Sequence, residues 1–379
     1  AHGIPTGIIG TNAYLWCGHS APASTTTPGA LYFHRLLARM WQAGCLAAAM
    51  EVSSHGLDQE RVLGAEFDTA VFTNLSRDHL DYHRDMEEYF RAKRRLFAAL
   101  PAQSFKKGIA IVNADDLYGQ KLLEWMQEED LPAFSFGLGE HCMIRMQGSP
   151  PPGYTLYGTS AMFKIGSTML PLRLRLVGRH NVYNLLAALG VSYALEVELD
   201  PARLQSALDN LVYVRGRLQP VNSGQPFHVL VDYAHTPEAL RSVLSMLTSL
   251  RCHNRIITVF GAGGDRDPGK RPLMGEAAAT LSQVVVVTSD NPRTEDPHAI
   301  IQMILSGIPS GSTAEVYVEP DRARALSFAI HMACPGDIVL IAGKGHEDYQ
   351  VVGKERRHFD DVEEAEKALL QRERGRGWS

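Results

Sequence analysis

Two short apolar runs, each closed by polar residues, constrain the fold of this chain more than any other feature. Residues 46–50 run into Glu51 and the pair Ser53–Ser54, and residues 70–75 run into a polar segment at 76–83. An apolar run that ends in this way is typical of a buried strand in a parallel sheet. Because open α/β sheets bind ligands at the carboxyl edge of their strands, we predict an α/β fold with a site where these runs end.

The polar residues after the two runs predict a metal site. If the two strands are neighbours, one rim of the sheet receives Glu51, Asp78, His79, Asp81 and His83. Mg²⁺ is usually held by one or two carboxylates together with water and substrate phosphates. We therefore expect Mg²⁺ at this rim, although a glutamate that ends a strand is also common as a solvated loop residue.

A helix is expected over residues 86–100, with acidic residues in its first part and basic residues later. It carries Lys93. A lysine in an arginine-rich helix is equally well explained as part of a solvated face, so Lys93 alone does not indicate a function.

The composition predicts an ordinary globular protein with two cores. The chain has 379 residues, of which 45% are hydrophobic and 21% charged, which is enough for two domains of roughly 150 residues. A net charge of −5 argues against nucleic acid as the main partner. Five widely spaced cysteines without a C-x-x-C pair predict reduced thiols and no zinc site. No apolar run approaches the roughly 20 residues of a membrane span and no signal peptide is evident, so we expect a cytoplasmic protein without membrane insertion.

The second half of the chain alternates strands and helices, which predicts a Rossmann-like domain. Strands are expected at residues 228–231, 256–260, 284–287, 316–318 and 338–341, and helices near 237–250, 272–282, 297–306 and 321–333. We place the domain boundary after residue 214, which gives domains of residues 1–214 and 215–379. Within the first domain, alternation of apolar and polar residues at 169–176 predicts a half-exposed antiparallel strand.

Three segments of the first domain closely resemble one protein family. Residues 51–57 read E-V-S-S-H-G-L, residues 73–83 read T-N-L-S-R-D-H-L-D-Y-H, and residues 92–93 read A-K. All three are similar to the central domain of the Mur ligases, and the similarity continues to about residue 360. The resemblance implies a central, mostly parallel sheet domain of the P-loop ATPase type with a small antiparallel sheet, followed by a Rossmann-like C-terminal domain.

The phosphate-binding loop of that family is not recognisable in this sequence. Residues 7–12 read G-I-I-G-T-N, but Ala13 and Tyr14 follow where a P-loop has Gly-Lys-Thr. No G-K-[ST] occurs elsewhere in the sequence. Gly10 fits a later glycine strand of the family better. We therefore expect the chain to begin just after the P-loop and its helix, without the family's N-terminal uridine-binding domain.

The resemblance assigns a metal site and a nucleotide-sugar site residue by residue. Glu51 and His79 match metal-site residues, and Lys93 matches a lysine that CO₂ carbamylates to an anionic metal ligand; these three are also the catalytic candidates. Carbamylation needs a neutral amine, so burial would have to lower the pKa of Lys93. The residues that match contacts to the nucleotide-sugar peptide are Thr26, Thr27, Ser53, Gln59 and Arg61. Taken alone, the Thr-Thr-Pro sequence also fits a helix N-cap.

Four further residues match contacts to ATP. They are Asn184, Arg217, Asp232 and His235. The resemblance implies that Asp232 lies toward the ribose and His235 near the adenine. Taken alone, His235 also fits a capping residue before Thr236.

The sequence D-N-P-R at 290–293 resembles the signature of the Mur ligases that add meso-diaminopimelate instead of lysine. The matching contacts to the amino acid are Arg266, Asp290, Asn291, Pro292, Arg293, Gly343 and Glu347. Diaminopimelate has a distal carboxylate that lysine lacks, and arginine can pair with it bidentately. With lysine bound, Arg293 would be left unpaired, which is costly. Glu347 suits the ammonium, although D-N-P-R by itself is also a good turn after a strand.

Together the matches imply an ATP-dependent amide-bond ligase of peptidoglycan precursor synthesis. ATP would phosphorylate the terminal carboxylate of UDP-MurNAc-L-Ala-D-Glu, and the amine of meso-diaminopimelate would attack the acyl phosphate, with Mg²⁺ stabilising the negative charge. We expect a monomer. Because the P-loop is missing, the alternative is an inactive fragment or a non-enzymatic descendant that binds amino acid or nucleotide. An oxidoreductase, suggested by G-A-G-G-D-R-D at 261–267, is a weaker alternative because the rest of the dinucleotide fingerprint is absent.

Overall fold

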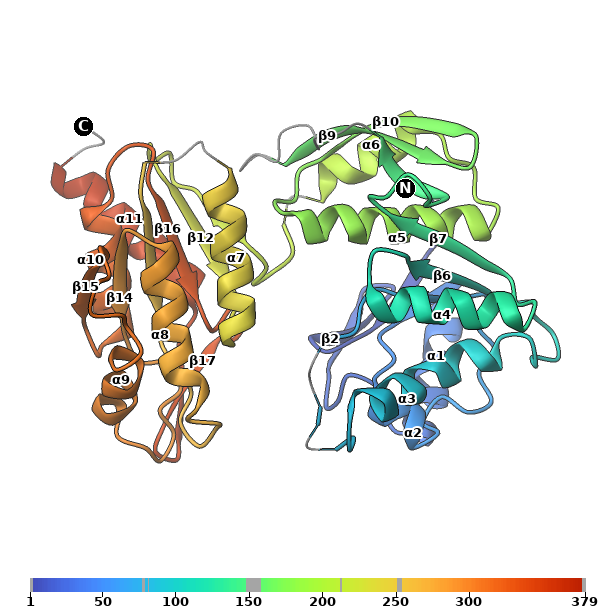
Figure 1. Ribbon diagram of the computed structural model, residues 1–379, viewed down its shortest axis with the longest axis horizontal. Coiled ribbons are helices and arrows are strands. Elements are labelled where there is room, and N and C mark those ends of the chain that lie inside the picture. Colours follow the sequence, from blue (N-terminus) through green and yellow to red (C-terminus); the bar gives the residue numbers. More distant parts are fainter. Residues whose placement is uncertain are drawn as a thin grey trace. The chain divides into compact units, whose positions relative to one another are not determined.

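The computed structural model divides the chain into two compact units (Figure 1). The residues that it describes are 3–76, 79–80, 82–147, 158–211, 213–250 and 254–376. The first unit consists of Ala1–Pro152, Ser160–Leu174 and Arg179–Asn210, and the second of Gly153–Thr159, Arg175–Gly178 and Leu211–Ser379. Because short segments of the two units alternate along the sequence, the boundary after residue 214 stays a prediction.

The first unit contains two sheets, and the smaller one has the strand order β3-β2-β1-β4. Its strands are β1 (Thr6–Ile9), β2 (Ala13–Trp16), β3 (His19–Pro22) and β4 (Ala47–Met50). β1 pairs in parallel with β4 and antiparallel with β2. Helix α1 (Ala30–Gln42) buries Phe33, Leu36 and Met40 in the same cluster as Ile9 and Tyr14. The spacing of three and four residues between these side chains makes one apolar face.

The larger sheet of this unit has the order β10-β9-β8-β7-β6-β5. Its strands are β5 (Thr69–Phe72), β6 (Ile109–Asn113), β7 (Ala133–Gly137), β8 (Ile144–Gln147), β9 (Thr159–Ile165) and β10 (Thr168–Leu174). The strands from β5 to β8 are parallel, and β9 runs antiparallel to β8. The strand predicted from alternation is β10, which buries Leu170, Leu172 and Leu174. The antiparallel part therefore extends the parallel sheet and is not a separate layer.

Helices also pack against this larger sheet. They are α3 (Met86–Ala99), α4 (Leu117–Glu128), α5 (Arg179–Ala194) and α6 (Pro201–Asn210). The short helix α2 (Ser54–Asp58) instead places Leu57 in the core of the smaller sheet. The side chains of Phe90 and Phe97 on α3 and of Leu122 and Met126 on α4 share one core with β5 and β6. The helix predicted over residues 86–100 is confirmed by α3.

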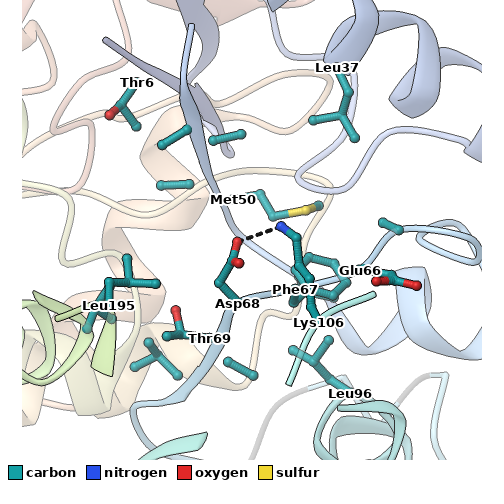
Figure 2. A pocket seen from close by; sticks show the side chains of 18 of the residues that line it. Thr6, Leu37, Met50, Glu66, Phe67, Asp68, Thr69, Leu96, Lys106 and Leu195 are labelled. Carbon is teal, nitrogen blue, oxygen red and sulfur yellow. Dashed lines mark hydrogen bonds and ion pairs between the residues drawn. The ribbon is translucent and has the colours of Figure 1, made fainter. Parts of the chain in front are cut away.

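The prediction that β4 and β5 are neighbouring buried strands was wrong. They lie at the edges of two different sheets, and three of the four residues of β4 are exposed. Both strands line one cavity of about 910 Å³, and Figure 2 shows Met50 of β4 and Thr69 of β5 at its wall. Asp68 and Lys106 form an ion pair of 2.6 Å there. The apolar runs correctly predicted two strands but not their neighbours, because β4 pairs with β1 and β5 pairs with β6.

The second unit is a six-stranded sheet of order β11-β12-β16-β13-β14-β15, with a separate hairpin β17-β18. Its strands are β11 (Gln219–Val221), β12 (His228–Asp232), β13 (Ile256–Phe260), β14 (Val284–Val287), β15 (Glu315–Val318), β16 (Ile338–Ala342), β17 (Tyr349–Val352) and β18 (Glu355–His358). All neighbouring strands from β12 to β15 in this order pair in parallel. The edge strand β11 pairs antiparallel with β12.

The helices of the second unit are α7 (Pro237–Ser249), α8 (Lys270–Leu281), α9 (Pro297–Leu305), α10 (Arg322–Met332) and α11 (Asp361–Arg376). Helices α7, α8 and α9 share one apolar cluster with one face of the sheet, and α10 and α11 share a second cluster with the other face. Successive residues of β16 alternate between the two clusters, as the pleat of a strand requires. The Rossmann-like fold predicted for this region is confirmed.

No helix among the described residues combines the length and the apolar character that a bilayer span requires.

Candidate functional site

In the first unit, Thr27 connects the loop before α1 to the end of β4. Its buried hydroxyl donates to the carbonyl oxygen of Glu51 at 3.0 Å and accepts from the Ser53 amide at 2.8 Å. The guanidinium of Arg61 donates to the carbonyl oxygen of Thr27 at 2.8 Å. The structure thus brings Glu51, predicted for the metal site, together with three residues predicted for the nucleotide-sugar site.

The carboxylate of Glu51 lies beside two threonine hydroxyls. The Thr11 hydroxyl donates to Glu51 Oε2 at 2.6 Å and lies 3.1 Å from the Thr26 hydroxyl. A Cβ atom at Gly10 would lie only 2.8 Å from Glu51 Oε1, so a larger residue there would displace the Glu51 carboxylate. Thr11 was missed as a site residue. The signal was the same one that identified Glu51, namely polar residues directly after a short apolar run.

Gln59 and Arg61 form a second polar pair next to this loop. The Gln59 side-chain oxygen accepts from Arg61 Nε at 3.0 Å and from Nη2 at 2.6 Å. Together with the carbonyl of Thr27, Gln59 therefore fixes the plane of the guanidinium. A planar cation held in this way suits a phosphate or a carboxylate.

Lys93 on α3 is half-buried and points at the end of β4. Its Nζ donates to the carbonyl oxygen of Val52 at 3.2 Å. Burial lowers the pKa of Lys93, and the nearby Glu51 carboxylate only partly opposes this. The lowered pKa is the condition that carbamylation of this amine needs.

His79 lies in a group of rings beside Lys93. Its ring is 5.3 Å from that of His55 and 5.7 Å from that of Tyr89, and Lys93 Nζ lies 5.9 Å from the same Tyr89 ring. The backbone of His79 is left-handed, with a φ of 54°, which is uncommon for a residue other than glycine. Two of the three predicted metal-site residues, His79 and Lys93, therefore share Tyr89 as a neighbour.

The prediction that His83 lies at an open rim was wrong. His83 is buried, its Nε2 lies 2.9 Å from the Ser54 hydroxyl, and its ring stacks on Tyr89. Burial of a ring against an aromatic neighbour makes it part of the packing. Asp78 and Asp81, which were predicted for the same rim, lie outside the described residues.

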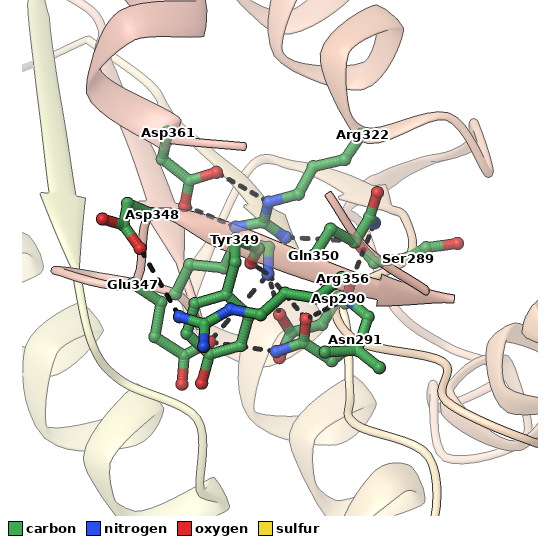
Figure 3. A network of polar contacts seen from close by, with 12 residues as sticks. Ser289, Asp290, Asn291, Arg322, Glu347, Asp348, Tyr349, Gln350, Arg356 and Asp361 are labelled. Carbon is green, nitrogen blue, oxygen red and sulfur yellow. Dashed lines mark hydrogen bonds and ion pairs between the residues drawn. The ribbon is translucent and has the colours of Figure 1, made fainter. Parts of the chain in front are cut away.

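In the second unit, the residues after β14 and β16 form a polar network (Figure 3). The central cation is Lys344, whose side chain is fully buried. Its Nζ lies 3.2 Å from Asp290 Oδ1 and donates to Asn291 Oδ1 at 3.1 Å and to the carbonyl oxygen of Tyr349 at 2.7 Å. Burial lowers the pKa of Lys344, and Asp290 opposes that effect. Burial alone would raise the pKa of Asp290, but Lys344 and Arg322 outweigh it and leave this pKa below its usual value.

The side chain of Asn291 links Lys344 to Glu347 by two hydrogen bonds. While its side-chain oxygen accepts from Lys344, its Nδ2 donates to Glu347 Oε2 at 2.9 Å. Burial and the neighbouring Asp290 raise the pKa of Glu347. A carboxylate in this setting gains from a cationic ligand, because an ammonium would offset both effects. Lys344 was missed in the sequence, where G-K-G at 343–345 signals only a loop.

Arg293 and Arg266 both lie at the loop that follows β13. Arg293 Nη1 donates to the carbonyl oxygen of Gly264 at 2.8 Å, and a Cβ atom at Gly263 would lie 3.0 Å from that nitrogen and 3.7 Å from Arg266 Cγ. A Cβ atom at Gly264 would lie 1.9 Å from the carbonyl oxygen of Pro292. The glycines of this loop therefore serve close packing against D-N-P-R, which replaces the dinucleotide explanation. Gly343, which was also predicted to contact the amino acid, has a φ of 119°, a backbone conformation that favours glycine.

Tyr233 is the centre of a ring cluster that contains two of the predicted ATP residues. The ring of His235 lies 4.5 Å from it, the guanidinium of Arg217 lies 5.4 Å from its centroid, and the ring of His346 lies 4.9 Å away. Flat rings next to a cation suit stacking on a base. Tyr233 and His346 were missed because aromatic residues in loops carry no spacing signal.

The other two predicted ATP residues differ in their surroundings. Asp232 at the end of β12 is buried, and its oxygens accept from the amides of Leu218 at 2.8 Å and Ala234 at 2.9 Å. Burial raises the pKa of Asp232. Its carboxylate therefore holds the turn, and its contact with ribose stays a prediction. Asn184 lies in the first unit on α5, and its Nδ2 donates to Asn181 Oδ1 at 3.2 Å.

Comparison with known protein families accounts for most of the chain. Residues 2–192 match the Mur ligase middle domain, and residues 216–345 match the Mur ligase, glutamate ligase domain. This chain belongs to the Mur ligase family.

Curated relatives of this Mur ligase carry a specific name. The UDP-N-acetylmuramoyl-L-alanyl-D-glutamate--2,6-diaminopimelate ligase of Geobacter metallireducens is 43% identical over 383 residues, which covers 97% of this chain and 73% of the relative. The enzyme of the same name from Synechococcus elongatus is 45% identical over 371 residues, with 97% and 71% covered.

Solved structures agree with the family assignment. A structure of a ligase of the same name covers 97% of this Mur ligase and 73% of its own chain, with a TM-score of 0.70 and 35% identity. FolC of E. coli, solved with ADP, has a TM-score of 0.64 at 18% identity, with 99% of this chain and 84% of FolC covered. The second likeness shows the shared fold alone.

Proposed function

We propose that this Mur ligase joins meso-diaminopimelate to UDP-MurNAc-L-Ala-D-Glu in an ATP-dependent reaction that forms an amide bond through an acyl phosphate. The observation that carries the proposal is the arrangement of Glu347, Asn291 and Arg293 after two parallel strands. An oriented carboxylate offers a partner for an ammonium group. An arginine held by a glycine loop offers a partner for a carboxylate. The names of the relatives favour this function over a non-enzymatic binding protein or an oxidoreductase.

The residues around Thr27 are the proposed nucleotide-sugar peptide site. Thr26, Thr27, Ser53, Gln59 and Arg61 supply hydroxyl, amide and guanidinium donors within one connected set of hydrogen bonds. An anionic substrate suits such donors, and Arg61 supplies the charge. Because the guanidinium is already oriented, little conformational entropy would be lost on binding.

The residues at the end of β4 fit Mg²⁺. Glu51 supplies carboxylate oxygens of the kind that this ion prefers, and Lys93 has the lowered pKa that its conversion to a carbamate needs. We propose Glu51, His79 and carbamylated Lys93 as the residues that hold the metal. When bound, Mg²⁺ would neutralise charge on the phosphates of ATP. The chain's own part is to orient the carboxylate of Glu51 through the Thr11 hydroxyl.

For ATP we propose contacts with Asn184, Arg217, Asp232 and His235. The ring cluster around Tyr233 supports a base-stacking role for His235, and the guanidinium of Arg217 suits a phosphate. We further propose that the protein acts in the cytoplasm as a monomer, which sedimentation equilibrium of the purified chain would check.

The test is an assay of phosphate release and product mass with ATP, Mg²⁺, UDP-MurNAc-L-Ala-D-Glu and either meso-diaminopimelate or L-lysine. We expect phosphate and the tripeptide product only with all substrates present. Because a site built around a charged partner rejects an analogue that lacks it, we expect the rate with lysine to be lower by at least about 100-fold. Equal rates with both amino acids would contradict the proposed specificity.

A binding experiment separates the proposed function from its alternative. Titration calorimetry with meso-diaminopimelate measures the amino-acid site without catalysis. Absence of phosphate release together with retained binding of meso-diaminopimelate would favour the non-enzymatic binding protein. Absence of both would count against the assignment of Arg293 and Glu347.

A further inference from the structure

Cys17 lies in the tight turn that connects β2 to β3. Trp16 and His19 are paired across the hairpin, so only Cys17 and Gly18 form the turn. Their φ angles are 36° and 82°, the left-handed pair that a two-residue hairpin turn needs and that Asn-Gly adopts most easily. A cysteine at the first of these positions is unfavourable for the backbone. The turn holds its side chain at the exposed end of the hairpin.

Cys45 is placed by the end of helix α1. The amide of Gly44 donates to the carbonyl oxygen of Trp41 at 3.0 Å, and the amide of Cys45 donates to that of Met40 at 2.9 Å. Gly44 has a φ of 87°. This pattern is a Schellman motif, which ends a helix with one left-handed glycine and defines the direction of the next residue. The side chain of Cys45 is buried.

The two turns bring the sulfur atoms together. Cys17 Sγ and Cys45 Sγ lie 3.0 Å apart, although 28 positions separate the residues in the sequence. The hydrogen bond with Cys17 and burial raise the pKa of the Cys45 thiol. The Cys17 side chain is exposed, and the neighbouring Cys45 side chain is buried. An accessible thiol next to a second thiol is the arrangement found in cysteines that oxidise reversibly.

We propose that Cys17 and Cys45 form a reversible dithiol–disulfide pair that peroxide oxidises. In the first step the Cys17 thiolate attacks one oxygen of hydrogen peroxide, the O–O bond breaks, and a sulfenic acid and hydroxide form. In the second step the sulfur of Cys45 attacks the Cys17 sulfur, the S–O bond breaks, and water leaves with the proton of the Cys45 thiol. Overall, two thiols and one hydrogen peroxide give one disulfide and two water molecules. This modification is independent of the proposed ligase activity.

The disulfide would close a ring that contains the candidate substrate loop. The chain from Cys17 to Cys45 includes Thr26, Thr27 and helix α1. A covalent bond across this segment restricts the unfolded chain and so stabilises the folded first unit. The expected shift is a rise of roughly 5 °C in the Tm of the first transition on oxidation, which added thiol would reverse.

The test is peptide mapping of the full chain after treatment with an equal concentration of hydrogen peroxide. Free thiols are blocked with N-ethylmaleimide, and the protein is digested without reductant. We expect a linked peptide that contains Cys17 and Cys45 and is lighter than its reduced parts by two hydrogen atoms. We expect dithiothreitol to release it. Recovery of Cys17 and Cys45 in two separate peptides that are not linked to each other would overturn the proposal.

Variants separate the pair from general oxidation. Cys334→Ser removes an exposed thiol elsewhere and should leave the linked peptide and the Tm shift unchanged. In Cys45→Ser, or Cys45→Ala if the serine variant does not fold, Cys17 should stop at the sulfenic acid, which dimedone traps. The same Tm shift in a Cys45 variant would overturn the proposal, as would a linked peptide that joins Cys17 to Cys142.

Discussion

Arg293 combines an unusual backbone with a partly used side chain. Its φ is 49°, and within the described residues its guanidinium donates through Nη1 alone, to the carbonyl oxygens of Gly264 and Asn291. The left-handed backbone is unfavourable for arginine and therefore lowers the stability of the fold. Strained backbone of this kind is found mostly at functional sites, which agrees with a carboxylate-binding role for Arg293. The remaining donors, Nε and Nη2, match the two oxygens of such a ligand.

We predict that Arg293→Met raises the KM for meso-diaminopimelate roughly 30- to 150-fold, which corresponds to about 2–3 kcal/mol for a lost hydrogen-bonded charge pair. The kcat should change less, because the distal carboxylate lies away from the reacting amine. Steady-state kinetics measure both constants. Arg324→Met, at an exposed position of α10, is the matched control. An unchanged KM in Arg293→Met would remove Arg293 from the amino-acid site.

Lys93 provides a prediction about pH. Burial places its folded-state pKa below the unfolded value, which is about 10.4. Between these two pKa values the unfolded chain binds more protons than the folded one, so the free energy of unfolding contributed by this group rises with pH. We therefore expect urea unfolding between about pH 8 and 10 to give a less positive slope of free energy against pH in Lys93→Met than in the parent protein.

The control for this slope is Lys121→Met. The side chain of Lys121 is partly exposed, and its ion pair with Glu87 raises its pKa. A raised pKa contributes stability that is lost as the pH rises, so any change in slope should have the opposite sign. Identical slopes in the Lys93 variant and the parent would contradict a lowered pKa for Lys93.

At the scale of elements, the loop before α1 depends on one hydroxyl. Thr27 bonds to the Glu51 carbonyl and the Ser53 amide from a fully buried position. We predict that Thr27→Val lowers the free energy of unfolding by about 1–3 kcal/mol, because two buried backbone groups lose their partner. Denaturant unfolding measures this. Thr168→Val, at the exposed start of β10, should change the free energy of unfolding far less. Equal effects of the two substitutions would contradict a stabilising role for the Thr27 hydroxyl.

The loops after β14 and β16 depend on Lys344. We predict that Lys344→Met destabilises the second unit by about 3–5 kcal/mol, because it leaves the buried carboxylate of Asp290 without its cation. It should also weaken binding of meso-diaminopimelate, since Asn291 loses the group that orients it. Urea unfolding and titration calorimetry measure the two effects.

A double variant tests the cause of that destabilisation. If the uncompensated charge is responsible, Lys344→Met combined with Asp290→Asn should be less destabilised than the sum of the two single changes, because residues in contact are coupled. Strictly additive free energies would contradict the role of this ion pair.

The sequence predicted elements better than it predicted their partners. The five strands and four helices expected in the second unit all form, because buried parallel strands such as β14 are continuous apolar runs with clear ends. The same rule identified β4 but placed it beside β5, and this was wrong. A run of apolar residues predicts a strand but not its neighbours: β4 pairs with β1, and β5 pairs with β6.

For the molecule as a whole, the sequence predicted which segments carry site residues better than it predicted which of their side chains make contacts. Glu51 was found because it follows an apolar run, and Asp290 because D-N-P-R resembles a family signature. Thr11 was overlooked although it also follows an apolar run, and it contacts Glu51 40 positions away. Lys344 was missed because its role depends on Asn291, which lies 53 positions away. Only the folded backbone brings such pairs within hydrogen-bonding distance.

The cavity between β4 and β5 leaves apolar surface of the first unit open to solvent. It has a volume of about 910 Å³, and three of the four residues of β4 on its wall are exposed. Apolar surface that water can reach binds the dye ANS, whose fluorescence then rises. We predict that the folded protein binds ANS and that Ala48→Asp, which places a charge on the cavity wall, weakens this binding. Equal dye fluorescence in the parent and the variant would contradict an open apolar cavity at this place.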